Sequence, residues 1–265
     1  MKFTKMHGLG NDYLYVKADA LPADAAELAV KYSDRHMGVG SDGIIWILPS
    51  DVADARMHIF NADGSEARMC GNGIRCVGKY LHDRGFVPQG TQLLHVDTLS
   101  GVKELDLTFD ACGRVSSVSV DMGVAVVNAP LQLPEQGLSC VPVDVGNPHA
   151  VIFCEDAEAV PLAQLGPAIE HSPLFPGGVN VEFVQVMGSQ ELRMRVWERG
   201  SGITMACGTG SCASVAAAVA WGHCPDGEPV TVHLDGGDLL VSVDEGGRVT
   251  MTGPATFISD GETLD

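Results

Sequence analysis

Apolar and polar residues alternate along most of this chain, which is the pattern of β-strands with one buried face. The clearest alternating runs are residues 105–109, 115–122, 192–197, 230–234, 239–243 and 249–251. Glycine pairs at 236–237 and 246–247 separate the last three runs. We therefore expect β-hairpins and an antiparallel sheet at that end of the chain.

Four shorter segments have the apolar spacing of helices. Residues 23–32 and 164–170 are two of them. Residues 74–81 place apolar side chains or glycine at the i, i+3, i+4 and i+7 positions, which predicts an amphipathic helix. Residues 214–221 are mostly Ala and Val, so this helix is apolar on every side. A helix of that composition is predicted to be buried all round.

Two segments about half the chain apart have nearly the same sequence. Cys70-Gly71-Asn72-Gly73 precedes the amphipathic helix, and Cys207-Gly208-Thr209-Gly210 precedes the apolar one. Each half therefore offers several strands and one helix headed by a cysteine. We expect an α+β fold of two pseudo-symmetric lobes, each a mostly antiparallel sheet curled around a central helix, with the active site in the cleft between them.

The boundary between the lobes is placed near residues 111–114, where Cys112-Gly113 interrupts two strand patterns. This division predicts an N-terminal lobe of residues 1–112 plus 254–265, which carries Cys70. The C-terminal lobe is then residues 113–253, which carries Cys207.

Composition excludes several classes of function. The chain has 265 residues, of which 45% are hydrophobic and 19% charged, as in ordinary globular proteins. Its net charge of −18 argues against nucleic acid, which needs a basic surface, and an acidic substrate would need a locally positive pocket. We find no signal peptide, basic leader or apolar run of about 18 residues. We therefore expect a cytoplasmic protein that binds no membrane.

The eight cysteines do not indicate a disulfide framework or a zinc site. In a chain without a secretion signal, most are expected to stay reduced as small buried side chains, including Cys76 and Cys212. No Cys-x-x-Cys or His-x-x-x-His spacing is present, so no metal site is expected.

A cysteine at a helix N-terminus has a distinct chemistry. The free backbone N–H groups and the positive end of the helix dipole suit a carboxylate, and they lower the pKa of a thiol. Two such sites indicate a base on one face of a carbon and an acid on the other. A thiolate–thiol pair would then invert a stereocentre, with one proton shared between two coupled groups.

Seven segments in order along the chain carry a resemblance to a known family. They are residues 6–12 (Met-His-Gly-Leu-Gly-Asn-Asp), 61–66 (Asn-Ala-Asp-Gly-Ser-Glu), 70–76 (Cys-Gly-Asn-Gly-Ile-Arg-Cys), 146–149 (Gly-Asn-Pro-His), 180–183 (Asn-Val-Glu-Phe), 198–202 (Glu-Arg-Gly-Ser-Gly) and 206–210 (Ala-Cys-Gly-Thr-Gly). The chain resembles diaminopimelate epimerase through these motifs, and the match runs on to residues 251–255. The resemblance implies an isomerase of lysine and peptidoglycan precursor synthesis that inverts the α-carbon of LL-diaminopimelate to the meso isomer. It also implies a homodimer that needs no pyridoxal phosphate, other cofactor or metal.

The same resemblance implies a role for each site residue. Cys70 and Cys207 would be the two acid/base groups, and His149 would support the thiol chemistry. Glu198 would hold the α-ammonium of the substrate. The reacting α-carboxylate would lie on backbone N–H groups around Gly71, Asn72, Gly208 and Thr209. The distal end of the substrate would be held by Asn11, Asn61, Asn147, Asn180 and Arg199.

Other interpretations stay open from sequence alone. Asn11 and Asn61 also fit turns, His149 also fits a turn, and Glu198 with Arg199 also fits a surface ion pair. A related racemase of another amino acid, such as histidine, would share the scaffold, although the arginine and the asparagines favour a substrate with a second carboxylate. A redox or metal-binding cysteine protein is the alternative outside this class.

Overall fold

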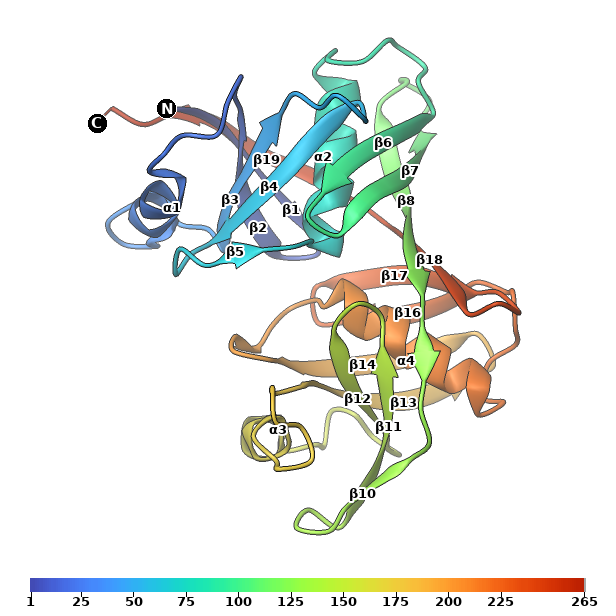
Figure 1. Ribbon diagram of the computed structural model, residues 1–265. Helices are drawn as coiled ribbons and strands as arrows, with labels where there is room; N and C mark the ends of the chain where they lie inside the picture. The colour runs from blue at the N-terminus through green and yellow to red at the C-terminus, as the bar shows by residue number, and fades with distance from the viewer. Residues whose placement is uncertain (265) are drawn as a thin grey trace. The chain divides into compact units, whose positions relative to one another are not determined.

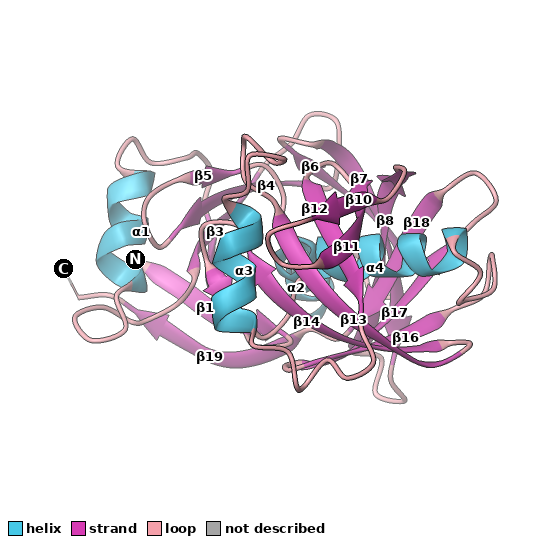
Figure 2. Cartoon of the chain, turned by 90° about the horizontal axis from the view of Figure 1, so that it is seen from below, coloured by secondary structure: helices cyan, strands magenta, loops and turns pink. Residues whose placement is uncertain are grey.

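The computed structural model describes residues 1–264, which contain four α-helices and many short strands (Figure 2). The chain divides into two compact units. Unit 1 is Met1–Val120 with the C-terminal segment from Gly253, and unit 2 is Asp121–Thr252. The sequence-based boundary lies in the turn before strand β8 (Val115–Val124), whereas the units divide within β8, because this long strand runs from one unit into the next.

Unit 1 has two helices, α1 (Ala25–Ser33) and α2 (Gly71–Asp83). Its other strands are β1 (Lys2–Gly8), β2 (Asn11–Lys17), β3 (Gly43–Leu48), β4 (Ala55–Asn61), β5 (Glu66–Ala67), β6 (Leu93–Thr98), β7 (Gly101–Phe109) and β19 (Thr256–Glu262). The sheet order is β19-β1-β2-β3-β4-β6-β7-β8, with β5 paired to β4. Two of these pairs, β2–β3 and β4–β6, are parallel and the others are antiparallel.

Unit 2 has the helices α3 (Leu162–Glu170) and α4 (Gly208–Ala220). Its strands are β9 (Val126–Val127), β10 (Leu131–Leu133), β11 (Leu138–Asp144), β12 (Pro148–Phe153), β13 (Asn180–Gly188), β14 (Glu191–Glu198), β15 (Gly202–Ile203), β16 (Val230–Leu234), β17 (Gly237–Val243) and β18 (Arg248–Gly253). The order β9-β11-β12-β13-β14-β16-β17-β18 again contains two parallel pairs, β12–β13 and β14–β16.

The two units repeat one arrangement of elements. In each, a hairpin leads through a short helix to a parallel strand, and a second helix follows a two-residue strand (Figure 1). That second helix, α2 or α4, has 13 residues in both units. It contacts strands near both ends of its sheet: β1, β2, β6 and β7 in unit 1, and β11, β12, β16 and β17 among others in unit 2. Each sheet therefore curls around its long helix.

Burial along the long helices follows the sequence pattern. Ala213, Val215, Ala217 and Ala218 of α4 are fully buried, and so are Ile74 and Val77 of α2. Cys76 and Cys212 are also fully buried, which confirms their packing role. The hairpins at 236–237 and 246–247 join β16 to β17 and β17 to β18, as predicted. The first helix begins at Ala25, two residues later than expected. In residues 1–264 we find no helix of the length and apolarity needed to span a membrane.

Candidate functional site

Cys70 is the N-cap residue of α2. Its backbone is extended (φ −137°, ψ 116°), and its Sγ accepts a hydrogen bond from the Gly73 N–H at 3.3 Å. The sulfur therefore takes the place of the hydroxyl or carboxylate oxygen that usually caps a helix. The thiol also donates to Asn11 Oδ1 at 3.4 Å.

Asn11 reaches Cys70 from the β1–β2 hairpin. The turn is formed by Leu9 and Gly10, both with positive φ (57° and 87°), so Asn11 is the first residue of β2 rather than the turn residue. Its Nδ2 donates to Asp42 Oδ2 at 2.7 Å, which directs Oδ1 toward the thiol. Asp42 thereby fixes the orientation of the amide.

The first turn of α2 is held by a buried cation. Arg75 is completely buried and donates to Asn72 Oδ1 (2.9 Å), to the Gly71 carbonyl (3.2 Å) and to the Pro254 carbonyl (3.2 Å). Asn72 is itself buried, with its side-chain oxygen directed at the guanidinium. Asn72 can therefore bind a ligand through its backbone N–H, as expected for a residue at the N-terminal end of a helix, which we call the helix mouth. Asn61 ends β4 and donates to Ser65 Oγ at 3.0 Å.

Cys207 is the N-cap of α4 in the same geometry. Its backbone is extended (φ −115°, ψ 111°), and Sγ accepts from the Gly210 N–H at 3.3 Å. Thr209 Oγ1 lies 3.5 Å from the sulfur. The two cysteines thus cap helices of equal length through the same N–H position, three residues after the cap.

A series of polar contacts continues from Thr209 into the unit. Asn147 Nδ2 donates to Thr209 Oγ1 at 3.3 Å, and Asn147 Oδ1 lies 3.1 Å from His149 Nε2. His149 Nδ1 lies 2.7 Å from Glu182 Oε1, and both of these side chains are fully buried. His149 is therefore a member of a buried network and not a turn histidine at the surface.

Glu198 lies at the end of β14, beside Cys207. Its carboxylate accepts hydrogen bonds from Thr204 Oγ1 and from the Cys207 thiol. Burial raises the pKa of Glu198, and the nearby charge of Glu182 adds to this effect. A ligand cation beside this carboxylate would favour its ionised form and so oppose both effects.

The sequence-based expectation of a lowered thiol pKa is wrong at Cys207. Burial raises the pKa of this thiol well above its usual range, and the charges of Glu198 and Glu182 raise it further. The hydrogen bonds from Thr209 and Gly210 act in the opposite direction but do not prevail. Cys207 is therefore held as the thiol at neutral pH.

Asn180 and Arg199 meet at one end of the β13–β14 pair. Asn180 Nδ2 donates to the Pro148 carbonyl (3.0 Å), and its Oδ1 accepts from the Arg199 backbone N–H (2.9 Å). The amide thus ties two backbone segments together, which makes it a scaffold for the site as well as a candidate ligand. The Arg199 side chain is exposed and donates to the Gly177 carbonyl at 3.2 Å. An exposed guanidinium in this position can bind a carboxylate.

Sequence reasoning missed two buried charged residues of these networks, Glu182 and Arg75. Both lie inside motifs that were singled out, and each is a charged residue next to apolar neighbours. A charge in such a position is rarely buried without a specific partner, and this was the signal available.

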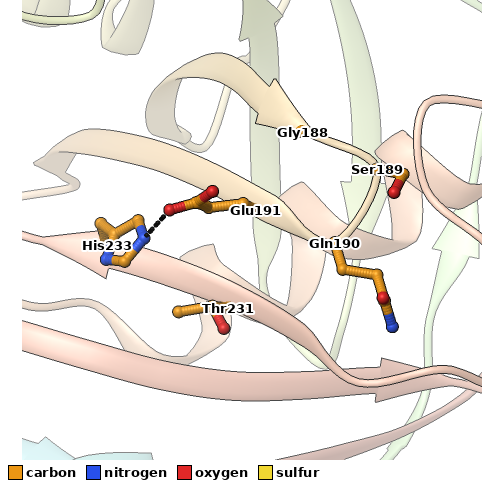
Figure 3. A pocket seen from close by; sticks show the side chains of 6 residues that line it. All are labelled: Gly188, Ser189, Gln190, Glu191, Thr231 and His233. Carbon is orange, nitrogen blue, oxygen red and sulfur yellow. Dashed lines mark hydrogen bonds and ion pairs between the residues drawn. The ribbon is translucent and has the colours of Figure 1, made fainter.

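Two further observations concern metal ligands and a surface pocket. Within residues 1–264, no group of three or more His, Cys, Asp and Glu side chains is arranged to hold a metal ion. A surface pocket of about 350 Å³ in unit 2 is lined by residues of the β13–β14 turn and of β16 (Figure 3). It contains the Glu191–His233 pair and none of the predicted site residues.

Comparison with known proteins gives consistent results. The family model for diaminopimelate epimerase matches residues 3–127 and 141–258. A diaminopimelate epimerase of Desulfitobacterium hafniense is 48% identical, over 100% of this chain and 99% of that protein. One of Bacillus subtilis is 44% identical, over 98% of this chain and 97% of that protein.

Solved structures show the same fold at low identity. A Bacillus anthracis phenazine biosynthesis protein of the PhzF family superposes with a TM-score of 0.81 at 17% identity, covering 100% of this chain and 99% of that one. A hydroxyproline epimerase from Agrobacterium vitis gives 0.74 at 18% identity, covering 98% and 91%. The structures establish the shared fold, and the matched residues with the full-length relatives show that this chain belongs to the diaminopimelate epimerase family.

Proposed function

We propose that this isomerase inverts the α-carbon of LL-diaminopimelate to give the meso isomer by a two-base mechanism, with Cys70 and Cys207 as the acid/base pair. The observation that carries the proposal is the matched pair of N-cap cysteines. Each sulfur accepts an N–H bond at 3.3 Å at the mouth of a 13-residue helix. The mechanism requires that the two thiols reach opposite faces of one carbon.

The helix mouths would supply the electrostatic part of the catalysis. Removal of an α-proton next to an ionised carboxylate places additional charge on the carboxylate oxygens. The backbone N–H groups of Gly71, Asn72, Gly208 and Thr209 are donors at fixed positions, and each such donor can contribute ~3 kcal/mol in the transition state. The helix dipoles act in the same direction. No cofactor is needed for this form of stabilisation.

The other predicted residues would select the substrate. Glu198, which lies beside Cys207, would pair with the α-ammonium. Arg199 presents an exposed guanidinium suited to a bidentate contact with the distal carboxylate. Asn11, Asn61, Asn147 and Asn180 would complete the recognition of the distal end without adding net charge. We further propose that the enzyme acts as a homodimer in the cytoplasm, in lysine and peptidoglycan precursor synthesis.

The decisive test is isotope exchange. The protein is incubated with LL-diaminopimelate in deuterated water under reducing conditions and without added cofactor, and the α-position is followed by NMR. Appearance of the meso isomer with deuterium at the inverted carbon supports the proposal. Absence of both inversion and exchange would exclude it.

Single substitutions then test the two roles separately. Cys70→Ser and Cys207→Ser should each lower kcat by several orders of magnitude, because either loss leaves one face of the carbon without its acid or base. Cys76→Ser changes a buried cysteine outside the proposed pair and serves as the control. Full activity in either of the first two variants would contradict the two-base mechanism. Oxidation that joins Cys70 to Cys207 should abolish activity until the protein is reduced.

A further inference from the structure

Glu182 is a buried carboxylate that neither the motif interpretation nor the proposed mechanism uses. Its side chain is 0% exposed in the middle of the sheet of unit 2. One oxygen, Oε1, lies 2.7 Å from His149 Nδ1, and the other, Oε2, has no hydrogen-bond partner within residues 1–264. A carboxylate so far from water is costly to bury unless it is paired and hydrogen-bonded, and His149 is the partner that the structure gives it.

Glu182 lies directly under the mouth of α4. A side-chain carbon added at Gly210 would be only 2.8 Å from Glu182 Oε1 and 3.2 Å from Cys207 Sγ. The groups that face Glu182 are therefore His149 on β12, Glu198 on β14, and the cap of α4 with its thiol. Of these, only His149 is within hydrogen-bond distance of the carboxylate.

In the series of hydrogen bonds from Glu182 to Cys207, the donor and the acceptor of each bond can be assigned in one consistent way. Asn147 donates its Nδ2–H to Thr209 Oγ1, so its Oδ1 is the atom that faces His149 Nε2. Since Oδ1 can only accept, Nε2 must carry a hydrogen. The proton between Nδ1 and Glu182 Oε1 then belongs to a pair that is net neutral in either form.

The last hydrogen bond of the series is the one from the Thr209 hydroxyl to Cys207 Sγ. Thr209 Oγ1 already accepts a hydrogen bond from Asn147, which leaves the hydroxyl hydrogen free to point at Cys207 Sγ, 3.5 Å away. Whenever Cys207 becomes a thiolate, it thus finds two donors in place, this hydroxyl and the Gly210 N–H. Hydrogen bonds to an ionised acceptor are the strong ones.

We propose that Glu182 is a positioning residue which, through His149 and Asn147, fixes the Thr209 hydroxyl as a donor to Cys207 Sγ. The proposal rests on the proposed function for its catalytic consequence. Without a partner at Nδ1, neutral His149 can move its hydrogen to Nδ1, and its bare Nε2 would then draw the amide end of Asn147. The amide turns over, Thr209 must donate to Oδ1, and the thiolate loses one donor.

Two substitutions separate this role from the charge of Glu182. Glu182→Gln and Glu182→Leu both remove the charge, but the glutamine amide can still donate to Nδ1 and keep the hydrogen on Nε2. We expect Glu182→Gln to keep kcat within about 3-fold of the parent. Glu182→Leu should lose about 10- to 100-fold in kcat with KM within about 2-fold, as for the loss of one hydrogen bond to a charged group. Equal kcat values in the two variants would overturn the proposal.

Two controls address folding and route. Glu191→Leu makes the same change in the exposed Glu191–His233 pair of the same unit and should leave kcat unchanged (Figure 3). In a Thr209→Val background, which removes the hydroxyl at the end of the series, Glu182→Leu should have no more than about a 2-fold further effect. An undiminished effect in that background would show that Glu182 does not act through Thr209.

A readout that needs no turnover keeps this test separate from the proposed function. With [3-¹³C]cysteine labelling, the Cβ resonance of Cys207, assigned by its loss in Cys207→Ser, reports the thiol–thiolate equilibrium. Its midpoint should lie about one to two pH units higher in Glu182→Leu than in Glu182→Gln, as for the loss of one hydrogen bond to a charged group, and coincident midpoints would overturn the proposal. If the parent protein fails to isomerise diaminopimelate but these midpoints differ, the proposed function fails and the positioning role stands.

Discussion

Arg75 offers the clearest quantitative test of how the first helix mouth is held. Arg75→Met keeps most of the side-chain volume and removes a guanidinium that donates at least three hydrogen bonds, at 2.9, 3.2 and 3.2 Å. Each bond from a charged donor contributes about 1.5–3 kcal/mol. The loss is partly offset because the variant no longer buries a cation. A buried acceptor left without its donor costs about 1–3 kcal/mol, so the three acceptors together correspond to a net loss of about 4 kcal/mol after this offset.

The effect should appear in the free energy of unfolding. For a chain of this size, each kcal/mol lowers the thermal midpoint by about 2–4 °C, so a loss of about 4 kcal/mol corresponds to about 8–16 °C. Calorimetry or circular dichroism at pH 7 measures this shift. Arg56→Met is the matched control, because Arg56 is half-exposed in its ion pair with Asp97 and is expected to contribute less than about 1 kcal/mol.

The outcome also decides what Arg75 does for the site. If Arg75→Met unfolds within about 1 kcal/mol of Arg56→Met, then the three bonds do not stabilise the turn and the reasoning fails. If the large loss is found, the folded fraction of the variant should also show a raised KM, since Asn72 and Gly71 would no longer be fixed. Arg75→Lys should recover part of the stability, because an ammonium can replace some of the donors but not the planar fork.

Three further predictions concern unit 2 and its counterpart in unit 1. Alanine favours a helix over glycine by about 1 kcal/mol, yet Gly210→Ala should lower both the thermal midpoint and kcat. Its Cβ would lie 2.8 Å from Glu182 Oε1, an atom that is held by His149. Gly73→Ala would place its Cβ 2.6 Å from Cδ1 of Ile45, the end of a side chain that can rotate, and should be better tolerated in the same assays. Hydrogen bonds to two carboxylates raise the pKa of His233. The stabilisation from these bonds is present below the unfolded pKa near 6.5 and is lost as pH rises through the raised pKa. In chemical unfolding, His233→Gln should therefore lower the free energy of unfolding by on the order of 0.5 kcal/mol at pH 5 and leave it unchanged at pH 9. Burial raises the pKa of Glu198, so ionisation of this carboxyl destabilises the fold as pH rises above the unfolded pKa of about 4.5. Glu198→Gln should therefore raise the thermal midpoint at pH 7 but not at pH 4, while activity falls. A raised midpoint at both pH values would contradict this cause.

The elements that carry the site could be predicted because their signals are local. Alternation identified strands such as β14, β16 and β17, and the all-apolar run identified α4 as a buried helix. The repeated Cys-Gly-x-Gly segments predicted that Cys70 and Cys207 would begin helices, and both are the N-caps. These inferences need only the neighbouring residues, which the sequence provides directly.

The partners of each site residue depend on contacts that are distant in sequence. His149 and Glu182 are 33 residues apart and become adjacent only because β12 and β13 pair in parallel. The same pairing places Asn180 opposite His149. The thiol pKa was mispredicted at Cys207 for the same reason. The helix dipole is a local property, whereas burial and the charges of Glu182 and Glu198 follow from tertiary structure.

The two helix mouths match in geometry but differ in charge, and this difference bears on the reaction. Beneath the cap of α2 lies the Arg75 guanidinium, and Cys212 occupies the corresponding position of α4. Beneath the cap of α4 lies the Glu182 carboxylate, close to Gly210. In α2, the corresponding glycine faces the ends of an isoleucine and a methionine side chain instead. At the cap of α4, burial raises the pKa of the Cys207 thiol, and the nearby carboxylates of Glu198 and Glu182 raise it further. A two-base reaction must begin with one thiolate and one thiol, and two equivalent caps alone would leave the proton equally shared. Under the proposed mechanism, the raised pKa of the Cys207 thiol removes that equivalence, because it favours the thiol form at the cap of α4.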